Sequence, residues 1–167
     1  MSRRLPYIVF AAVIVVLDLY TKHLVLLNFR LHESLPVIPN FFDLVYVRNY
    51  GAAFGLGNRT DSSLVPILLS VGAIGVFIFV VIYSLKVAIS DRLMQTALHL
   101  ILGGAIGNLI DRFRFGYVVD FLDFYVVVGG VERHWPAFNV ADSAICVGIG
   151  LLMLDMFRKP AEAEEPA

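Results

Sequence analysis

The sequence predicts an all-α membrane protein with a small β element. Hydrophobic residues make up 59% of the chain and charged residues 16%, and the mean hydropathy is +0.79. A soluble domain of 167 residues has no interior large enough for so many apolar side chains, whereas transmembrane helices expose them to lipid. A polar, proline-bearing segment between the first two apolar runs supplies the β element of the prediction.

The first predicted span covers residues 5–27 and follows Arg3 and Arg4. Its apolar run is too long for a secretory signal, and no small-x-small cleavage site follows it. Asp18 and Lys22 lie four residues apart within this span, so they share one helix face. Two interpretations stay open: an ion pair that lets both residues tolerate their depth, or a structural role beside an active site.

Residues 28–63 are predicted to form short strands at the membrane surface. Pro36 and Pro39 exclude a continuous helix, and the alternating run Phe42–Val47 is typical of a strand. The following stretch, Asn49–Gly55, is apolar and punctuated by glycine. It is interpreted either as a hairpin turn or as a platform for a lipid-bearing substrate.

Three further spans are predicted. Residues 64–85 contain no charge, residues 93–111 are rich in small residues, and residues 138–157 are again apolar. Gly103 and Gly107 lie four residues apart, which lets a neighbouring helix approach closely.

The expected organisation is therefore a single integral-membrane domain with four spans, which puts both termini on one side. Basic residues number six on each side, but those near the termini are packed more tightly against the spans, which favours cytoplasmic termini. The segment Gly129–Trp135 is expected to be a mobile loop and is hypothesised to act as a lid. The full expectation is spans at about 5–27, 64–85, 93–111 and 138–157, extracytoplasmic segments 28–63 and 112–137, a cytoplasmic loop 86–92, and a polar tail 158–167.

Two acids, Asp120 and Asp142, lie where one apolar segment ends and the next begins. We expect them to meet, because an isolated carboxylate in a low-dielectric setting is costly. Two neighbouring carboxylates share a proton, so one can act as general base on a water while the other polarises a carbonyl. Such a pair predicts a bell-shaped pH profile. Arg112 and the amides of Asn108 and Asn139 are predicted to orient the pair.

Less specific interpretations of the acids are also available. Asp111 and Arg112 could form an interfacial ion pair, Asp123 could be a solvated loop residue, and Asp142 could be a helix N-terminal acid favoured by the dipole. Cys146 is interpreted as a small buried hydrophobe.

Several function classes are disfavoured by the sequence. The net charge of -1 argues against a nucleic-acid partner. The four histidines are scattered, so neither a Ser/His/Asp arrangement nor an H-E-x-x-H motif is present. No metal site and no cofactor are predicted.

Five motifs occur in a fixed order along the chain. They are DLYTK at Asp18–Lys22, NYGAAF at Asn49–Phe54, GGAIGNLIDR at Gly103–Arg112, VVDFLD at Val118–Asp123 and FNVADSAI at Phe138–Ile145. In these motifs the chain resembles lipoprotein signal peptidase, also called signal peptidase II, a bacterial family of intramembrane aspartic proteases.

The resemblance implies a fold of four transmembrane helices plus an extracytoplasmic β-cradle, which would fall in residues 28–63. It implies removal of the signal peptide from a prolipoprotein, just before a cysteine that carries diacylglyceryl, in the bacterial inner membrane. It also implies a membrane-lipid environment and inhibition by peptides of the globomycin type. Asp111 is assigned to structure together with Arg112. The family's catalytic aspartates fall on Asp120 and Asp142, and its supporting polar residues on Asp18, Lys22, Asn49, Asn108, Arg112 and Asn139.

Two rival functions remain at this stage. A small transporter or proton relay would also need buried acids and Lys22, but it predicts acids along a path across the membrane. Most acids here lie toward one face, with Asp155 as the chief exception. A non-catalytic membrane scaffold would have no use for a carboxylate pair.

Overall fold

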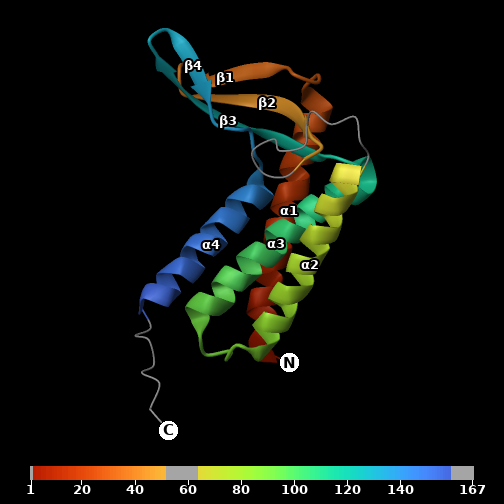
Figure 1. Cartoon of the computed structure of the whole chain (residues 1–167), viewed down its shortest axis with the longest axis vertical. Helices are drawn as coiled ribbons and strands as arrows, with labels where there is room; N and C mark the ends of the chain where they lie inside the picture. The colour runs from red at the N-terminus through yellow and green to blue at the C-terminus, as the bar shows by residue number, and fades with distance from the viewer. Residues whose placement is uncertain (1, 52–63, 159–167) are drawn as a thin grey trace.

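The computed structural model describes residues 2–51 and 64–158, which form a helical bundle with a small sheet at one end (Figure 1). Within these residues the four strands run antiparallel to their neighbours in the order β1-β2-β3-β4. The elements are a 3-10 turn η1 (Ser2–Arg4), helices α1 (Leu5–Asn28), α2 (Leu64–Lys86), α3 (Arg92–Phe115) and α4 (Val140–Arg158), and strands β1 (Ser34–Ile38), β2 (Phe42–Asn49), β3 (Val118–Val128) and β4 (Val131–His134).

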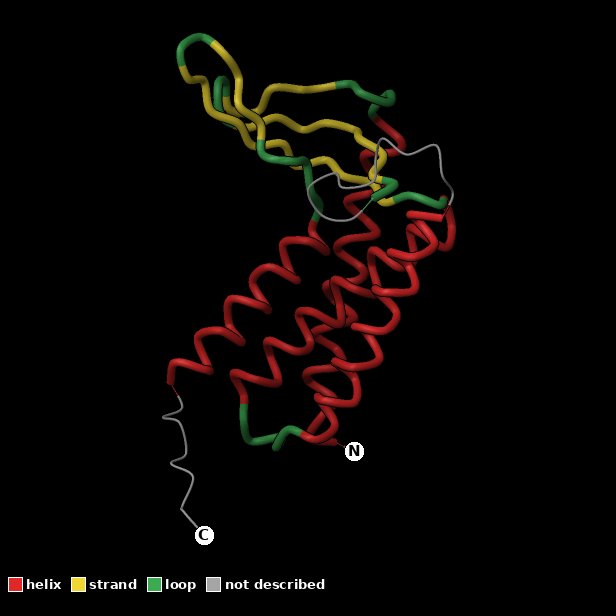
Figure 2. Tube along the Cα trace, in the orientation of Figure 1, coloured by secondary structure: helices red, strands yellow, loops and turns green. Residues whose placement is uncertain are grey.

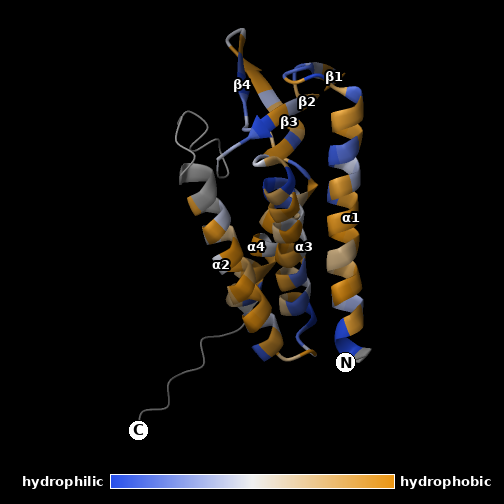
Figure 3. Ribbon diagram, turned by 90° about the vertical axis from the view of Figure 1, so that its right-hand side faces the viewer, coloured by the Kyte–Doolittle hydropathy of each residue, from blue (hydrophilic) through white to orange (hydrophobic). Residues whose placement is uncertain are grey.

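Three helices, α1, α3 and α4, are long and apolar enough to cross a membrane. In the described part of the chain α2 contributes a shorter apolar helix, Ser70–Lys86. Hydrophobic residues dominate all of these helices, whereas polar residues gather at the bundle ends and on the sheet (Figure 3). The chain is thus a multi-pass membrane protein, close to the predicted organisation in its helix bounds.

Helix α3 forms the centre of the bundle. Inside the protein, 67% of its apolar segment is buried, compared with 28% for α1 and 22% for α4. Its glycines explain the close packing. A Cβ on Gly103 would lie 2.9 Å from the carbonyl oxygen of Ala11 in α1, and one on Gly104 would overlap the carbonyl of Ala141 in α4. The predicted role of small residues in the third span is therefore confirmed.

The sheet extends further along the sequence than predicted. Strand β2 confirms the strand expected at Phe42–Val47, but half of the sheet comes from β3 and β4. The prediction of a loop over Gly129–Trp135 is wrong for Val131–His134, which pairs with β3. Gly129 and Gly130 adopt positive φ angles of 61° and 79°, so they form the turn of a hairpin whose flanks are rich in valine.

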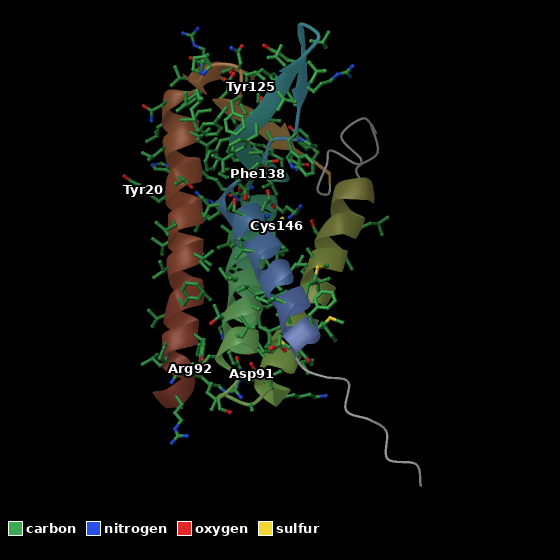
Figure 4. All side chains as sticks on the ribbon, turned by 90° about the vertical axis from the view of Figure 1, so that its left-hand side faces the viewer. Tyr20, Asp91, Arg92, Tyr125, Phe138 and Cys146 are labelled. Atoms are coloured by element: carbon green, nitrogen blue, oxygen red, sulfur yellow. The ribbon has the colours of Figure 1, made fainter. Side chains whose placement is uncertain are left out.

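Besides the connection from α1 to β1, two further connections between the sheet and the helices can be followed along the trace in Figure 2. Helix α3 ends at Gly116, whose left-handed φ of 77° turns the chain into β3. The backbone of Phe138 bridges to Leu122 of β3 just before α4 begins. The sheet therefore lies over the end of the bundle opposite the N-terminus and the Asp91–Arg92 turn (Figures 1 and 4).

Candidate active site

Asp120 lies in β3 and is only 1% exposed. Two amides hold its carboxylate. Asn49, at the end of β2, donates from Nδ2 to Oδ2 at 2.9 Å, and Asn139 donates from Nδ2 to Oδ1 at 2.7 Å. Both partners are neutral, so they stabilise the carboxylate without supplying a counter-charge.

Asp142 lies in the first turn of α4. Its Oδ1 accepts from Asn108 Nδ2 at 2.8 Å, and its backbone N–H donates to Asn139 Oδ1 at 2.9 Å. Asn139 also donates to Asn108 Oδ1 at 3.2 Å. The structure thus links Asp120 and Asp142 through the amides of Asn108 and Asn139. Asn139 contacts both acids, the carboxylate of Asp120 and the backbone N–H of Asp142.

The electrostatics of the pair are visible at Asp120. Burial, and after it the nearby charge of Asp142, raise the pKa of this carboxyl to about 7, although the hydrogen bonds from Asn49 and Asn139 and the charge of Lys22 lower it. A carboxyl with this pKa exists in both protonation states near neutral pH. Such a group can hold or release a proton during a reaction.

Behind the pair lies a buried ionic cluster. Lys22 of α1 is 2% exposed, and its Nζ lies 2.8 Å from Asp18 Oδ2 and 3.1 Å from Asp111 Oδ2. The ion pair expected between Asp18 and Lys22 is confirmed. The prediction that Asp111 pairs with Arg112 is wrong. Asp111 pairs with Lys22 and accepts the backbone N–H of Val119, because residues adjacent in a helix point in different directions.

Arg112 lies at the edge of the site. Its Nη2 is 3.4 Å from the carbonyl oxygen of Gly51, and its charge acts on both Asp120 and Asp142. The Gly51 N–H in turn donates to Asn49 Oδ1 at 2.9 Å. The remainder of the Asn49–Gly55 turn lies outside the described residues.

A cavity of about 710 Å³ opens beside the pair. Its helical wall is largely apolar, with the polar groups gathered at one end. Four polar residues of the site line the cavity: Asn49, Asn108, Arg112 and Asp142. The other lining residues are Ala73, Val76, Ile101, Ala105, Val118, Trp135, Pro136, Ala137, Phe138, Ser143, Ile145, Cys146 and Ile149.

Sequence reasoning missed two groups around this cavity. Cys146 was expected to be buried, but it is exposed and lines the cavity, one helical turn after Asp142, where Figure 4 labels it below Phe138. The four-residue spacing from Asp142 was the available signal. Trp135 also lines the cavity, and only its position just before the fourth apolar run marked it.

Asp123 is not the solvated loop residue that was expected. It lies in β3, is 9% exposed, and its Oδ2 is 2.9 Å from His134 Nδ1 across the hairpin. Although desolvation opposes it, hydrogen bonding to Asp123 and Glu132 raises the pKa of His134. Asp123 therefore belongs to the hairpin and lies apart from the Asp120–Asp142 pair.

Comparisons with known proteins show the family of the chain. The family model described as signal peptidase (SPase) II matches residues 10–158. The lipoprotein signal peptidase of Syntrophotalea carbinolica is 51% identical over 148 residues, covering 89% of this chain and 88% of the relative. That of Syntrophus aciditrophicus is 43% identical over 159 residues, covering 93% and 94%.

Among solved structures, a bacterial membrane enzyme determined by the in meso method superposes with a TM-score of 0.80 at 30% identity, covering 97% of this chain and 93% of its own. A second in meso structure of a bacterial membrane enzyme gives a TM-score of 0.77, also at 30% identity. The matches to the family model and to relatives span nearly the whole sequence, and the chain therefore belongs to the lipoprotein signal peptidase (signal peptidase II) family of proteases.

Proposed function

We propose that the chain is an intramembrane aspartic endopeptidase that removes the signal peptide from diacylglyceryl-modified prolipoproteins. Cleavage falls on the N-terminal side of the lipidated cysteine, and Asp120 and Asp142 activate the attacking water. The observation that carries the proposal is the pair itself, two carboxylates from β3 and α4 held by linked amides at the polar end of an apolar cavity.

The proposed reaction uses one proton shared by the pair. The ionised carboxylate takes a proton from water as the oxygen attacks the scissile carbonyl carbon. The protonated carboxyl gives its proton to the carbonyl oxygen, and a tetrahedral diol forms. As the C–N bond breaks, the amine nitrogen receives the proton first taken from water, and the diol returns its proton to the pair.

The supporting residues have separate tasks in this scheme. Asn49 and Asn139 fix the two oxygens of Asp120, and Asn108 fixes Asp142. Arg112, at the cavity edge, stabilises negative charge at the pair and orients the peptide. Asp18 and Lys22 support the amides from behind the site.

The cavity walls fit the substrate class. Apolar side chains of α2, α3 and α4, such as Val76, Ile101 and Ile149, would contact the apolar signal peptide. The outward faces of the helices, rich in exposed leucine, valine and isoleucine, would contact membrane lipid and the substrate's acyl chains. Peptide-like inhibitors of the globomycin type would occupy the same cavity.

For the membrane arrangement we propose that α2 also spans the membrane, which gives four spans together with α1, α3 and α4. Cytoplasmic termini would put the pair and the sheet near the extracytoplasmic face of the bacterial inner membrane, where a signal peptide presents its cleavage site. A transporter would distribute its acids across the bilayer, whereas Asp120 lies in β3, Asp142 in the first turn of α4, and Asp111 near the end of α3 that leads into the sheet. Asp155, 5% exposed near the other end of α4, is the exception.

The test is a gel-shift cleavage assay with purified protein and a diacylglyceryl-modified prolipoprotein. Asp120→Asn and Asp142→Asn should each remove cleavage by at least about 10³-fold, because an amide can neither take up nor release the proton. Asp123→Asn is the matched control: it makes the same change in the same strand as Asp120, at a carboxylate that contacts His134 instead.

Asp123→Asn should cleave at close to the native rate. Cleavage by all three variants would move the catalytic residues elsewhere, and no cleavage by a folded native protein would favour the transporter interpretation.

A further inference from the structure

The buried Lys22 has three polar partners, which equals the number of donors on an ammonium group. Besides the carboxylates of Asp18 and Asp111, at 2.8 and 3.1 Å, its Nζ donates to Asn108 Oδ1 at 3.0 Å. Lys22 is 2% exposed, so water does not replace these partners. Its position is therefore fixed by the protein.

The contact with Asn108 determines which way that amide faces. An asparagine amide can be turned to exchange its oxygen and its NH₂ group. An ammonium has no acceptor, so only the oxygen of Asn108 can face Lys22, and Asn139 Nδ2 donates to the same oxygen at 3.2 Å. The NH₂ group must then face the other way, where it donates to Asp142 at 2.8 Å.

Asp18 ties this arrangement to the start of α4. Its Oδ1 accepts the backbone N–H of Ala141 at 2.9 Å, one residue before Asp142. A Cβ on Gly107 would overlap Asp18 Oδ2, so the glycine lets the carboxylate lie between α1, α3 and α4. The Asp18–Lys22 pair thus contacts both the amide that holds Asp142 and the backbone that carries it.

The charges around Asp120 and Asp142 balance when they are counted. Among residues 2–51 and 64–158, the charged groups that face the pair are two cations and two carboxylates: Asp18 and Lys22 from α1, and Asp111 and Arg112 from α3. With all four ionised, their sum is zero. The pair alone then determines how many protons the site holds, and loss of either sign of charge would change that number.

We propose that Lys22 is a positioning residue for the pair. It orients the Asn108 amide toward Asp142, and its charge, balanced by Asp18 and Asp111, sets the pH range in which Asp120 and Asp142 share one proton. The inference rests on the proposed protease function and deepens it. Its basis is the set of contacts around one buried ammonium group, and it assigns α1 a part in the chemistry although α1 supplies no catalytic residue.

The test compares pH profiles of cleavage for the native chain, Lys22→Gln, Asp18→Asn and the double variant carrying both. Glutamine keeps a donor for Asn108 and removes the positive charge. The profile of Lys22→Gln should move up by about one pH unit or more, since negative charge left beside the pair favours its protonated forms. Asp18→Asn should move the profile down, and the double variant should return it close to the native position.

Opposite shifts that cancel cannot come from a purely structural role, which would lower the rate at every pH and make the double variant the worst of the three. Unmoved profiles, or a double variant that fails to return, would overturn the inference. Lys86→Gln, the same change at an exposed lysine at the other end of the bundle, is the control and should leave the profile in place.

Two safeguards keep the outcome decisive. If Lys22→Gln does not fold, Asp111→Asn leaves Lys22 in place and should still move the profile down. If the native chain does not cleave the prolipoprotein, the proposed function fails. If the native chain cleaves the prolipoprotein but the variant profiles do not move, the proposed role of Lys22 is overturned and the proposed function is not.

Discussion

At the scale of single residues, the two buried carboxylates of the site are held by neutral amides. Asn49, Asn108 and Asn139 donate to Asp120 and Asp142, while the cations Lys22 and Arg112 make no ion pair within 4.0 Å with either carboxylate in the described part of the chain. Direct ion pairs would keep both carboxylates ionised. Amides allow the pair to keep a proton, which a general acid requires.

The burial of Asp120 has a measurable consequence for stability. Its pKa rises from an ordinary 3.8 to about 7 in the folded protein, so the folded state holds a proton that the unfolded state releases between these values. Stability that is fully present below about pH 4 is therefore lost as the pH rises through 7. At pH 8 the loss from this group is on the order of a few kcal/mol.

Asp120→Asn removes this titration. Its thermal midpoint in detergent, relative to that of the native chain, should rise from pH 5 to pH 8. Glu33→Gln, at an exposed carboxylate outside the pair, should show no such rise. A difference between Asp120→Asn and the native chain that stays constant with pH would contradict the raised pKa.

Of the ion pairs around the site, the sequence predicted only the one between residues close together in the chain. Asp18 and Lys22 lie one helical turn apart, and their pairing was predicted. The partner of Asp111 comes from a distant helix, and the adjacent Arg112 was the wrong choice. Helical periodicity gives the face on which a side chain lies, but it does not say which element packs there.

At the scale of elements, the glycines of α3 set the distances between helices. Gly103 contacts α1 and Gly104 contacts α4 so closely that a methyl group has no room. Since Asp142 lies one residue beyond Ala141, the Gly104 contact also sets how far the start of α4, which carries Asp142, stands from α3.

Gly104→Ala should therefore destabilise the protein by about 1–3 kcal/mol, the usual cost of overpacking, and should reduce cleavage as α4 shifts. Thermal unfolding in detergent and the cleavage assay measure the two effects. Gly72→Ala in α2 is the matched control, because a Cβ there meets nothing within 4 Å, and its midpoint should be unchanged or higher. Equal midpoints for the two variants would refute the close-packing argument.

The strands illustrate the limit of local patterns. Residues 42–47 alternate and were predicted as a strand, whereas β3 contains a nearly continuous apolar run broken by Asp120 and Asp123. That pattern did not distinguish a strand from an apolar segment that leads into a transmembrane helix. The two acids point to opposite faces of the sheet because they lie three residues apart in one strand, with Asp120 opposite Val47 and Asp123 opposite Asp43.

At the scale of the whole molecule, the cavity joins the sheet end of the bundle to its membrane-facing helices. Its walls come from β2, the segment before α4, and α2, α3 and α4. The approximate bounds of the helices, and which acids lie near one another, could be predicted from hydropathy and from the motifs. The cavity could not, since it depends on how far α2 and α4 stand apart around α3.

The only cysteine of the sequence offers a probe of this cavity. Cys146 lines it, whereas Val147, the next residue, is 55% exposed and is not among the lining residues. A bound substrate-like peptide of the globomycin type should slow maleimide labelling of Cys146 several-fold, because it fills the space in front of the thiol.

The matched control is the double variant Cys146→Ser with Val147→Cys, whose thiol should label at the same rate with and without the peptide. Mass spectrometry of the intact protein measures both rates. Equal protection at both positions, or protection at neither, would show that the peptide binds elsewhere.

The position of the Asp18–Lys22 pair within α1 also bears on how the protein is made. The two charges neutralise each other inside a single helix, four residues apart. Helix α1, which precedes α2, α3 and α4 along the chain, thus carries its own counter-ion and needs no later segment to offset its charge in the bilayer. Asn108 and Asp111 reach Lys22 only when the third helix arrives, so the site is assembled around a pair that is already in place.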